Sequence, residues 1–245
     1  DQDLLYAGRH HARAGLRHHE CCTTDMRVMS ARESLSDILS DHVQRLSKTR
    51  PVIAQAYEDV VQRLLASDAG QNCPAEGEVL PSFLLPDDQG RLVSLDYFLE
   101  CGPVVVSMNR GHWCAFYLHE LEALQLFQAD IRDAGGQILA ITPERQVFAN
   151  ELVTSCKLDF PVLCDIDNDY ALSLGLAVWF GEEIKPLLLE LGIDLEEYQG
   201  NAGWVIPVPA TFVLNRDGRI VARFANADFR KRMEPAAILE TLKTL

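Results

Sequence analysis

Residues 103–121 read PVVVSMNRGHWCAFYLHEL, and this stretch decides the fold. The apolar run from Val104 to Met108 predicts a buried strand. Apolar residues then recur at helical spacing as far as Ile131, which predicts a helix that stops before the glycine pair at 135–136. Cys114 therefore falls at the junction between a strand and the helix that follows it.

Downstream of this helix, strands and helices continue to alternate. We expect a strand at 138–142, a helix at 144–157, a strand at 160–164, a helical and irregular segment at 170–203, a hairpin of 210–214 and 219–224, and a helix that begins near Pro235. This order predicts an α/β protein of the thioredoxin-like fold, with a mixed central sheet and helices on both faces.

The whole chain divides into three parts. Residues 1–30 have no apolar periodicity and are expected to be a flexible tail. Residues 31–77 are expected to form a helical extension followed by a linker, because apolar residues recur at helical spacing on both sides of Pro51. Residues 78–245 are then the thioredoxin-like domain. The extension could cap that domain or form the arm of a homodimer, and the sequence leaves both open.

Composition limits the partners of the chain. The 245 residues are 48% hydrophobic, which allows a sizeable core, and carry a formal net charge of −14. Such a charge repels nucleic-acid phosphates and anionic membranes. No apolar run approaches the roughly 20 residues that span a bilayer, and we see no signal peptide, so we expect a cytoplasmic protein. The seven cysteines are irregularly spaced, which argues against a secreted disulfide framework.

The tail concentrates residue types that bind metals. It holds four histidines and two cysteines, namely His10, His11, His18, His19, Cys21 and Cys22. Neutral imidazole and thiolate both bind zinc, but this spacing matches no standard zinc finger. We therefore expect no metal or other cofactor.

Cys114 is the candidate catalytic residue. Unpaired N–H groups and the dipole at a helix N-terminus favour a thiolate, which is the nucleophilic form of cysteine. Trp113 would offer a flat apolar surface to a substrate, while Arg110 and His112 could stabilise the thiolate or orient a ligand. The alternatives are an inert buried thiol, a core tryptophan and two solvated loop residues.

A second candidate element is the segment from Val208 through Pro209 to Thr211. A proline directly before a central strand needs a positional role, and a cis Val208–Pro209 peptide would provide one. In the thioredoxin-like fold such a turn faces the active cysteine, so its backbone could bind an extended substrate. The alternative is an ordinary proline at the end of a strand.

These segments resemble the AhpC/TSA family of peroxiredoxin-like redoxins. The run Arg110 to Tyr117, RGHWCAFY, is similar to the family's RGxWCPxC motif. Further matches are FPVLCD at 160–165, VPAT with DGR at 208–219, and DFRKRM at 228–233. The resemblance covers about residues 79–245 and implies a redox-active cysteine and an antioxidant, oxidoreductase role.

Two departures from the family bear on mechanism. Tyr117 stands where the motif has its second cysteine, so a dithiol cycle within the motif is excluded. In typical peroxiredoxins the peroxidatic cysteine follows a threonine by three residues and is helped by an arginine. When the chain is aligned on Glu120, Tyr117 stands at the position of the peroxidatic cysteine and Cys114 at the position of the threonine. Pro209 stands where the arginine is expected.

The sequence therefore predicts a thiol-dependent redox protein with one nucleophilic cysteine. Cys114 would reduce a small peroxide or a disulfide, and an external thiol, glutathione or a thioredoxin-like protein, would clear the product. Cys101, Cys156 and Cys164 are expected to be structural. One alternative is a non-catalytic binding module that kept the redoxin fold. A weaker one is an accessory protein that uses the metal-binding residue types of the tail.

Overall fold

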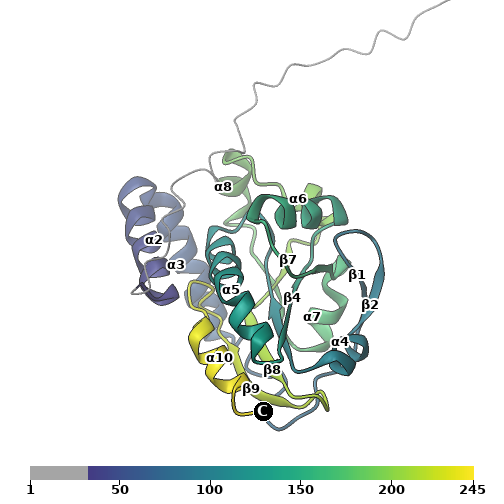
Figure 1. The fold of residues 1–245 in the computed structure, drawn as a ribbon. Coiled ribbons are helices and arrows are strands. Elements are labelled where there is room, and N and C mark those ends of the chain that lie inside the picture. Colours follow the sequence, from purple (N-terminus) through teal and green to yellow (C-terminus); the bar gives the residue numbers. More distant parts are fainter. Residues whose placement is uncertain (1–32) are drawn as a thin grey trace, which may run out of the picture.

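A computed structural model describes residues 33–245, and the predicted tail at 1–30 lies outside this part of the chain (Figure 1). Its centre is a five-stranded mixed sheet in the order β5-β4-β3-β8-β9. The strands are β3 (Val104–Met108), β4 (Gln137–Thr142), β5 (Val162–Cys164), β8 (Ala210–Leu214) and β9 (Ile220–Ala225). The central strand β3 is parallel to β4 and antiparallel to β8, and all its residues are buried.

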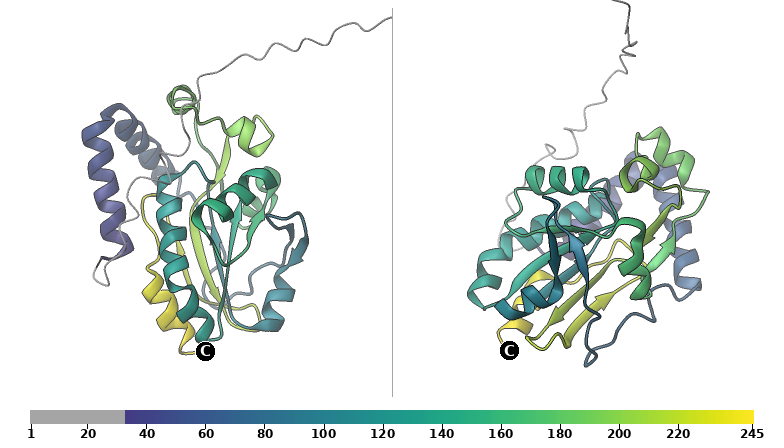
Figure 2. Two further views of the ribbon diagram at one scale, coloured as in Figure 1. Left: turned by 45° about the horizontal axis from the view of Figure 1, so that its top comes forward. Right: turned by 90° about the vertical axis from the view of Figure 1, so that its right-hand side faces the viewer.

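Helices cover both faces of this sheet (Figure 2). One face carries α5 (Ala115–Asp133), α6 (Gln146–Cys156) and α10 (Pro235–Leu242), and the other carries α4 (Leu95–Cys101) and α7 (Asp169–Ser173). Each face has its own hydrophobic core. The predicted α/β architecture is therefore confirmed, and β3 delivers the chain directly into α5 at Cys114.

The N-terminal extension is a pair of helices, α2 (Leu35–Thr49) and α3 (Pro51–Ala66), which lies beside α5 (Figure 1). Ser34 caps α2 in a capping box with Asp37, and Pro51 occupies the first turn of α3, where it needs no N–H partner. The carboxylate of Glu234 accepts the backbone N–H groups of Leu35 and Ser36, at 3.1 and 2.8 Å. The extension is thus tied to the C-terminal part of the domain.

Several short elements carry no readable sequence period, and none was predicted individually, although the segment 170–203 was expected to be helical and irregular. They are β1 (Leu84–Pro86), β2 (Leu92–Ser94), the 3₁₀ helix η1 (Ile166–Asn168), β6 (Ala177–Trp179), α8 (Lys185–Glu190), α9 (Leu195–Gln199) and β7 (Val205–Pro207). β6 and β7 form a separate antiparallel pair next to the predicted Pro209 turn. Three-residue strands are too short to show an alternation, so only tertiary packing defines them.

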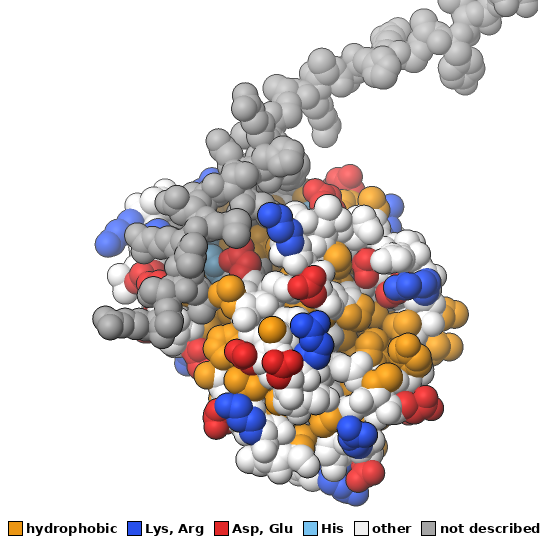
Figure 3. Space-filling view, in the orientation of Figure 1, with side chains coloured by type: hydrophobic (Ala, Val, Ile, Leu, Met, Phe, Trp, Pro, Cys, Tyr) orange, Lys and Arg blue, Asp and Glu red, His pale blue; other side chains and the backbone are white. Residues whose placement is uncertain are grey.

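The surface mixes both signs of charge with apolar patches. On the face drawn in Figure 3, Lys and Arg side chains lie interspersed with Asp and Glu. Within residues 33–245, no helix combines the length and apolar character needed to cross a membrane.

Candidate active site

Cys114 is the N-cap residue of α5 and its side chain is only 4% exposed. A tight turn delivers it there, with the Cys114 N–H donating to the Gly111 carbonyl at 3.1 Å. Gly111 has φ +126°, and a Cβ at this position would lie 2.5 Å from the carboxylate of Glu144. Only glycine therefore lets the chain pass from β3 into α5 at this point.

Arg110 is buried beside Cys114 in a cage of aromatic rings. Its guanidinium carbon lies 5.1, 4.4 and 4.0 Å from the ring centres of Trp113, Phe180 and Phe229. Burial lowers the pKa of Arg110, whereas the charge of Cys114 and a hydrogen bond to it favour the charged guanidinium. Arg110 Nε and Nη2 have no hydrogen-bond partner within residues 33–245. The site thus places a thiol beside a guanidinium with two free donors, in apolar surroundings.

Trp113 forms one wall of this cage. It is buried, its ring centre lies 5.8 Å from that of Phe180, and its indole Nε1 finds no partner in the described part of the chain. The ring is therefore next to Cys114 and Arg110, as the sequence suggested, but packed inside the protein rather than presented as an open surface.

His112 contacts Glu144 and Phe148 and is not part of the aromatic cage around Arg110. Its backbone N–H and its Nδ1 lie 2.8 and 2.7 Å from the two carboxylate oxygens of buried Glu144, and its ring stacks on Phe148. Burial acts to lower the pKa of His112, but the hydrogen bond and the charge of Glu144 outweigh it and raise that pKa. His112 thus anchors the Cys114 turn to β4 and α6 and is not a solvated loop residue.

Tyr117 fills the place of the motif's second thiol and is fully buried. Burial, together with the charges of Glu120 and Glu144, raises its pKa well above the usual value. Its hydroxyl has no hydrogen-bond partner among the described residues. A neutral, space-filling phenol describes it best.

Beneath the site, a buried ion pair joins Glu120 of α5 to Arg232. Ser107 and Thr211, from the neighbouring strands β3 and β8, donate to Glu120 Oε1 at 2.9 and 3.5 Å. Glu120 therefore belongs to a buried polar network and not to a solvated face of α5. The signal was its position four residues after Phe116, on the apolar stripe of the helix.

The contacts of Val208 and Thr211 in the 208–211 turn are made away from Cys114. Val208 packs in the core on the face opposite Cys114, against Gly70, and its N–H donates to the Leu176 carbonyl at 2.7 Å. Its N–H is thus not free for an extended substrate. The Thr211 hydroxyl donates to Glu120, which is paired with Arg232. All peptide bonds of residues 33–245 are trans, so the expectation of a cis Val208–Pro209 bond is wrong. Pro209 precedes the first residue of β8, where a missing N–H costs no ladder hydrogen bond.

Tyr57 of α3, which the sequence did not single out, also lines the cage. Its ring centre is 6.4 Å from that of Phe116 and 5.3 Å from that of Phe229. It belongs to the extension, far from the cysteine in sequence, so no local pattern could reveal its position.

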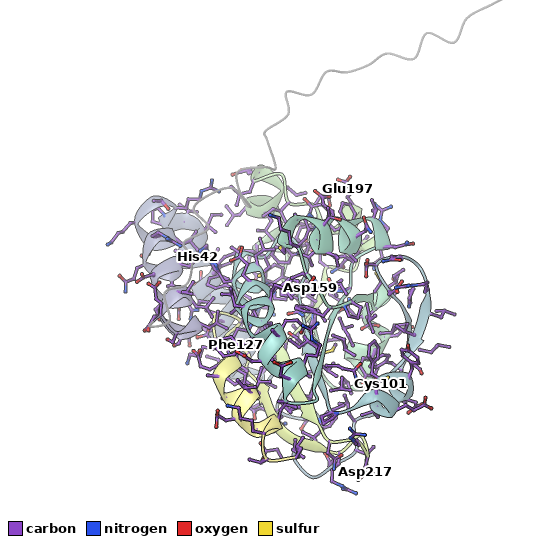
Figure 4. All side chains as sticks on the ribbon, in the orientation of Figure 1. His42, Cys101, Phe127, Asp159, Glu197 and Asp217 are labelled. Atoms are coloured by element: carbon purple, nitrogen blue, oxygen red, sulfur yellow. The ribbon has the colours of Figure 1, made fainter. Side chains whose placement is uncertain are left out.

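The other described thiols differ in environment. Cys164 is buried, and burial together with nearby carboxylates raises its pKa to about 12. Cys73 is buried against Arg223. Cys101 is exposed on α4 and is therefore not part of the core (Figure 4). Within residues 33–245, no three His, Cys, Asp or Glu side chains are grouped to hold a metal ion.

The fold and a cysteine at the start of α5 define a thioredoxin-fold redoxin. A family model for the AhpC/TSA family matches residues 77–223, so the chain belongs to that family. At the level of the family, this makes it one of the thiol-dependent peroxidases and redox proteins. No curated protein matches the sequence.

Solved structures share this fold at low sequence identity. Peroxidoxin BcpB from Mycobacterium tuberculosis is 18% identical with a TM-score of 0.54, covering 69% of this chain and 97% of that one. Enterococcus faecalis AhpC is 14% identical with a TM-score of 0.53, covering 69% and 90%. Xanthomonas campestris Peroxiredoxin Q is 14% identical with a TM-score of 0.51, covering 66% and 90%. The α2–α3 pair precedes the segment matched by the family.

Proposed function

We propose that this chain is a thiol-dependent peroxidase with a single nucleophilic cysteine, Cys114. The thiolate attacks one oxygen of a hydroperoxide, so that an S–O bond forms and the O–O bond breaks. Sulfur is oxidised by two electrons to the sulfenic acid, and the peroxide is reduced to an alcohol or water.

The observation that carries this proposal is the pairing of Cys114 with buried Arg110. A cation beside the sulfur favours the thiolate. The free Nε and Nη2 of Arg110 lie on one edge of a planar guanidinium and can donate to two acceptor oxygens at once. In a water-poor aromatic cage such donors stabilise developing negative charge strongly.

An external thiol then clears the sulfenic acid. It forms a mixed disulfide with Cys114 and releases water, and a second thiol reduces that disulfide. The identity of Tyr117 supports an external thiol, because no second cysteine stands in the motif. Glutathione and a thioredoxin-like protein are the two reductants to compare.

Steady-state consumption of hydrogen peroxide with each reductant, and of oxidised glutathione with the thioredoxin-like protein as reductant, tests the proposal. We expect turnover with a peroxide by the native chain and none by Cys114→Ser, and an intact mass increased by one oxygen when reductant is omitted. Turnover only with a disulfide would assign the site to thiol-disulfide exchange instead. A Cys114→Ser variant as active as the native chain, or no turnover with either substrate, would favour a non-catalytic binding module.

A further inference from the structure

Tyr57 brings an aromatic ring of the N-terminal extension against two rings that lie next to Cys114 and Arg110. Tyr57 lies in α3, outside the matched segment 77–223, and makes edge contacts with the rings of Phe116 and Phe229. Phe116 is two residues after Cys114, and the Phe229 ring lies against the guanidinium of Arg110. Two ring contacts thus place Tyr57 beside the aromatic cage of Arg110 and next to the first turn of α5, which Cys114 caps.

The charges that act on Tyr57 include two of the site itself. Burial, followed by the charge of Cys114, raises the pKa of Tyr57 to about 12, while the charges of Arg110 and of Arg50, at the start of α3, act in the opposite direction. The phenol therefore keeps its proton at neutral pH and is available as a hydrogen-bond donor.

Tyr117, the other tyrosine near the motif, has different neighbours. The charges that act on its phenol come from Glu120, Glu144, Cys156 and Arg232, beneath the site. Its position in the sequence makes it the obvious partner of Cys114, but its environment is that of the buried ion pair. Of the two phenols, Tyr57 is the one with Cys114 and Arg110 as electrostatic neighbours.

We propose that Tyr57 donates the proton that the leaving oxygen takes up when Cys114 reduces a hydroperoxide. This inference rests on the proposed peroxidase function. The Cys114 sulfur bonds to the terminal oxygen, the O–O electron pair goes to the departing alkoxide or hydroxide, and the Tyr57 hydroxyl protonates that oxygen. The Tyr57 phenolate then recovers a proton from water, so that atoms and charge balance.

The need for a donor depends on the leaving group. Hydrogen peroxide expels hydroxide, whose conjugate acid, water, is a very weak acid with a pKa far above neutral, so protonation of the leaving oxygen helps greatly. A peroxycarboxylic acid expels a carboxylate, whose conjugate acid has a pKa of about 4, and it leaves without a proton. The role of Tyr57 should therefore be visible with one oxidant and absent with the other.

The test compares the rate constant for Cys114 oxidation by hydrogen peroxide and by peracetic acid in the full chain and in Tyr57→Phe. We expect the rate with hydrogen peroxide to fall on the order of 10²-fold and the rate with peracetic acid to stay unchanged. Tyr97→Phe, which alters an exposed ring on α4, is the control and should change neither rate. Circular dichroism and thermal melting verify that each variant is folded.

Three results would overturn the inference. Equal losses with both oxidants would make Tyr57 a packing residue, and an unchanged rate with hydrogen peroxide would remove it from the reaction. A selective loss in Tyr117→Phe, without one in Tyr57→Phe, would move the role to the other phenol. If Cys114 of the native chain is inert to both oxidants, the proposed function fails first and the inference falls with it.

Discussion

The guanidinium carbon of Arg110 lies 4.0 Å from the centre of the Phe229 ring, deep inside the domain. A cation over an aromatic face gains about 2 kcal/mol when it is desolvated, which offsets only part of the cost of burying a charge. The other favourable partner is Cys114, whose negative charge and hydrogen bond favour the charged guanidinium. In the proposed reaction, this charged guanidinium would act at the Cys114 sulfur.

Replacing Arg110 by methionine should therefore spare the fold and impair the reaction. Arg110→Met keeps much of the apolar contact with the three rings but removes the cation and the two free donors. We expect the rate of Cys114 oxidation by hydrogen peroxide to fall on the order of 10²-fold. Arg216→Met, in the exposed hairpin turn, is the matched control and should react like the native chain. Equal rates for the two variants would remove Arg110 from the mechanism.

Gly111→Ala tests the turn that delivers Cys114. An added Cβ would lie 2.5 Å from Glu144 Oε1 and 2.7 Å from Trp113 Nε1, so one of these side chains must move. Gly77→Ala is the control, because Gly77 also has positive φ but no atom within 4 Å of the added Cβ. Gly77→Ala should lose about 1 kcal/mol of stability from backbone strain, and Gly111→Ala should lose more because of the added overlap. Only Gly111→Ala should also lose peroxide reactivity, as measured by Cys114 oxidation; retained reactivity would show that the turn tolerates the shift.

The Glu120–Arg232 pair should behave as a coupled structural unit. Arg232→Met leaves a carboxylate unpaired in the core, and we expect it to reduce the free energy of unfolding by about 3–5 kcal/mol. The double variant Glu120→Met with Arg232→Met removes both charges and should recover part of this loss. Urea denaturation of the four proteins measures the coupling. Strict additivity of the two single changes would contradict the ion pair.

His42 should make the contact between the extension and α5 sensitive to pH. Its Nδ1 lies 3.4 Å from His119 Nε2, and burial together with the charges of His119 and Arg45 lowers its pKa to about 4 (Figure 4). Because the unfolded chain binds this proton near pH 6.5, the neutral ring stabilises the fold fully above pH 6.5. That stabilisation is lost as the pH falls toward 4.

We expect the loss to amount to about 1–2 kcal/mol, discounted for the partial exposure of the ring. The measurement is the free energy of unfolding of the native chain and of His42→Gln at pH 7.5 and pH 4.5. The native chain should lose more stability than the variant over this interval. Equal losses would mean that the protonation of His42 is not linked to folding.

Much of the fold was predictable because long elements repeat their packing pattern. The buried run of β3, the apolar stripe of α5 and the turn between β8 and β9 each carry a local signal, and each appears at the expected place. The segment 170–203 carried no such signal. Its short strand and helices form because Trp204, Phe180 and Leu188 pack in the core. The residues they pack against include ones far away in the sequence, so the segment itself does not reveal these contacts.

The site was predictable only where residues are neighbours in the chain. Cys114, Trp113 and Arg110 lie within one turn, so the motif brought them together. Phe229 and Tyr57 contact the same cage from opposite ends of the sequence, and neither hydrophobic periodicity nor residue spacing predicts that they do. Val208 is a neighbour of Pro209 in the chain, but its side chain packs on the face of the sheet opposite Cys114. Sequence adjacency was therefore misleading for this residue.

The most direct test of the central claim is the ratio of two oxidation rates within one molecule. Cys101 is exposed and Cys114 is 4% exposed, so access alone favours Cys101. Native chain treated with substoichiometric hydrogen peroxide at neutral pH is digested, and the sulfenic acid at each cysteine is trapped and quantified by mass spectrometry. Our account predicts that Cys114 is oxidised first and by a wide margin, despite its burial. Preferential oxidation of Cys101, or equal oxidation of the two, would contradict it.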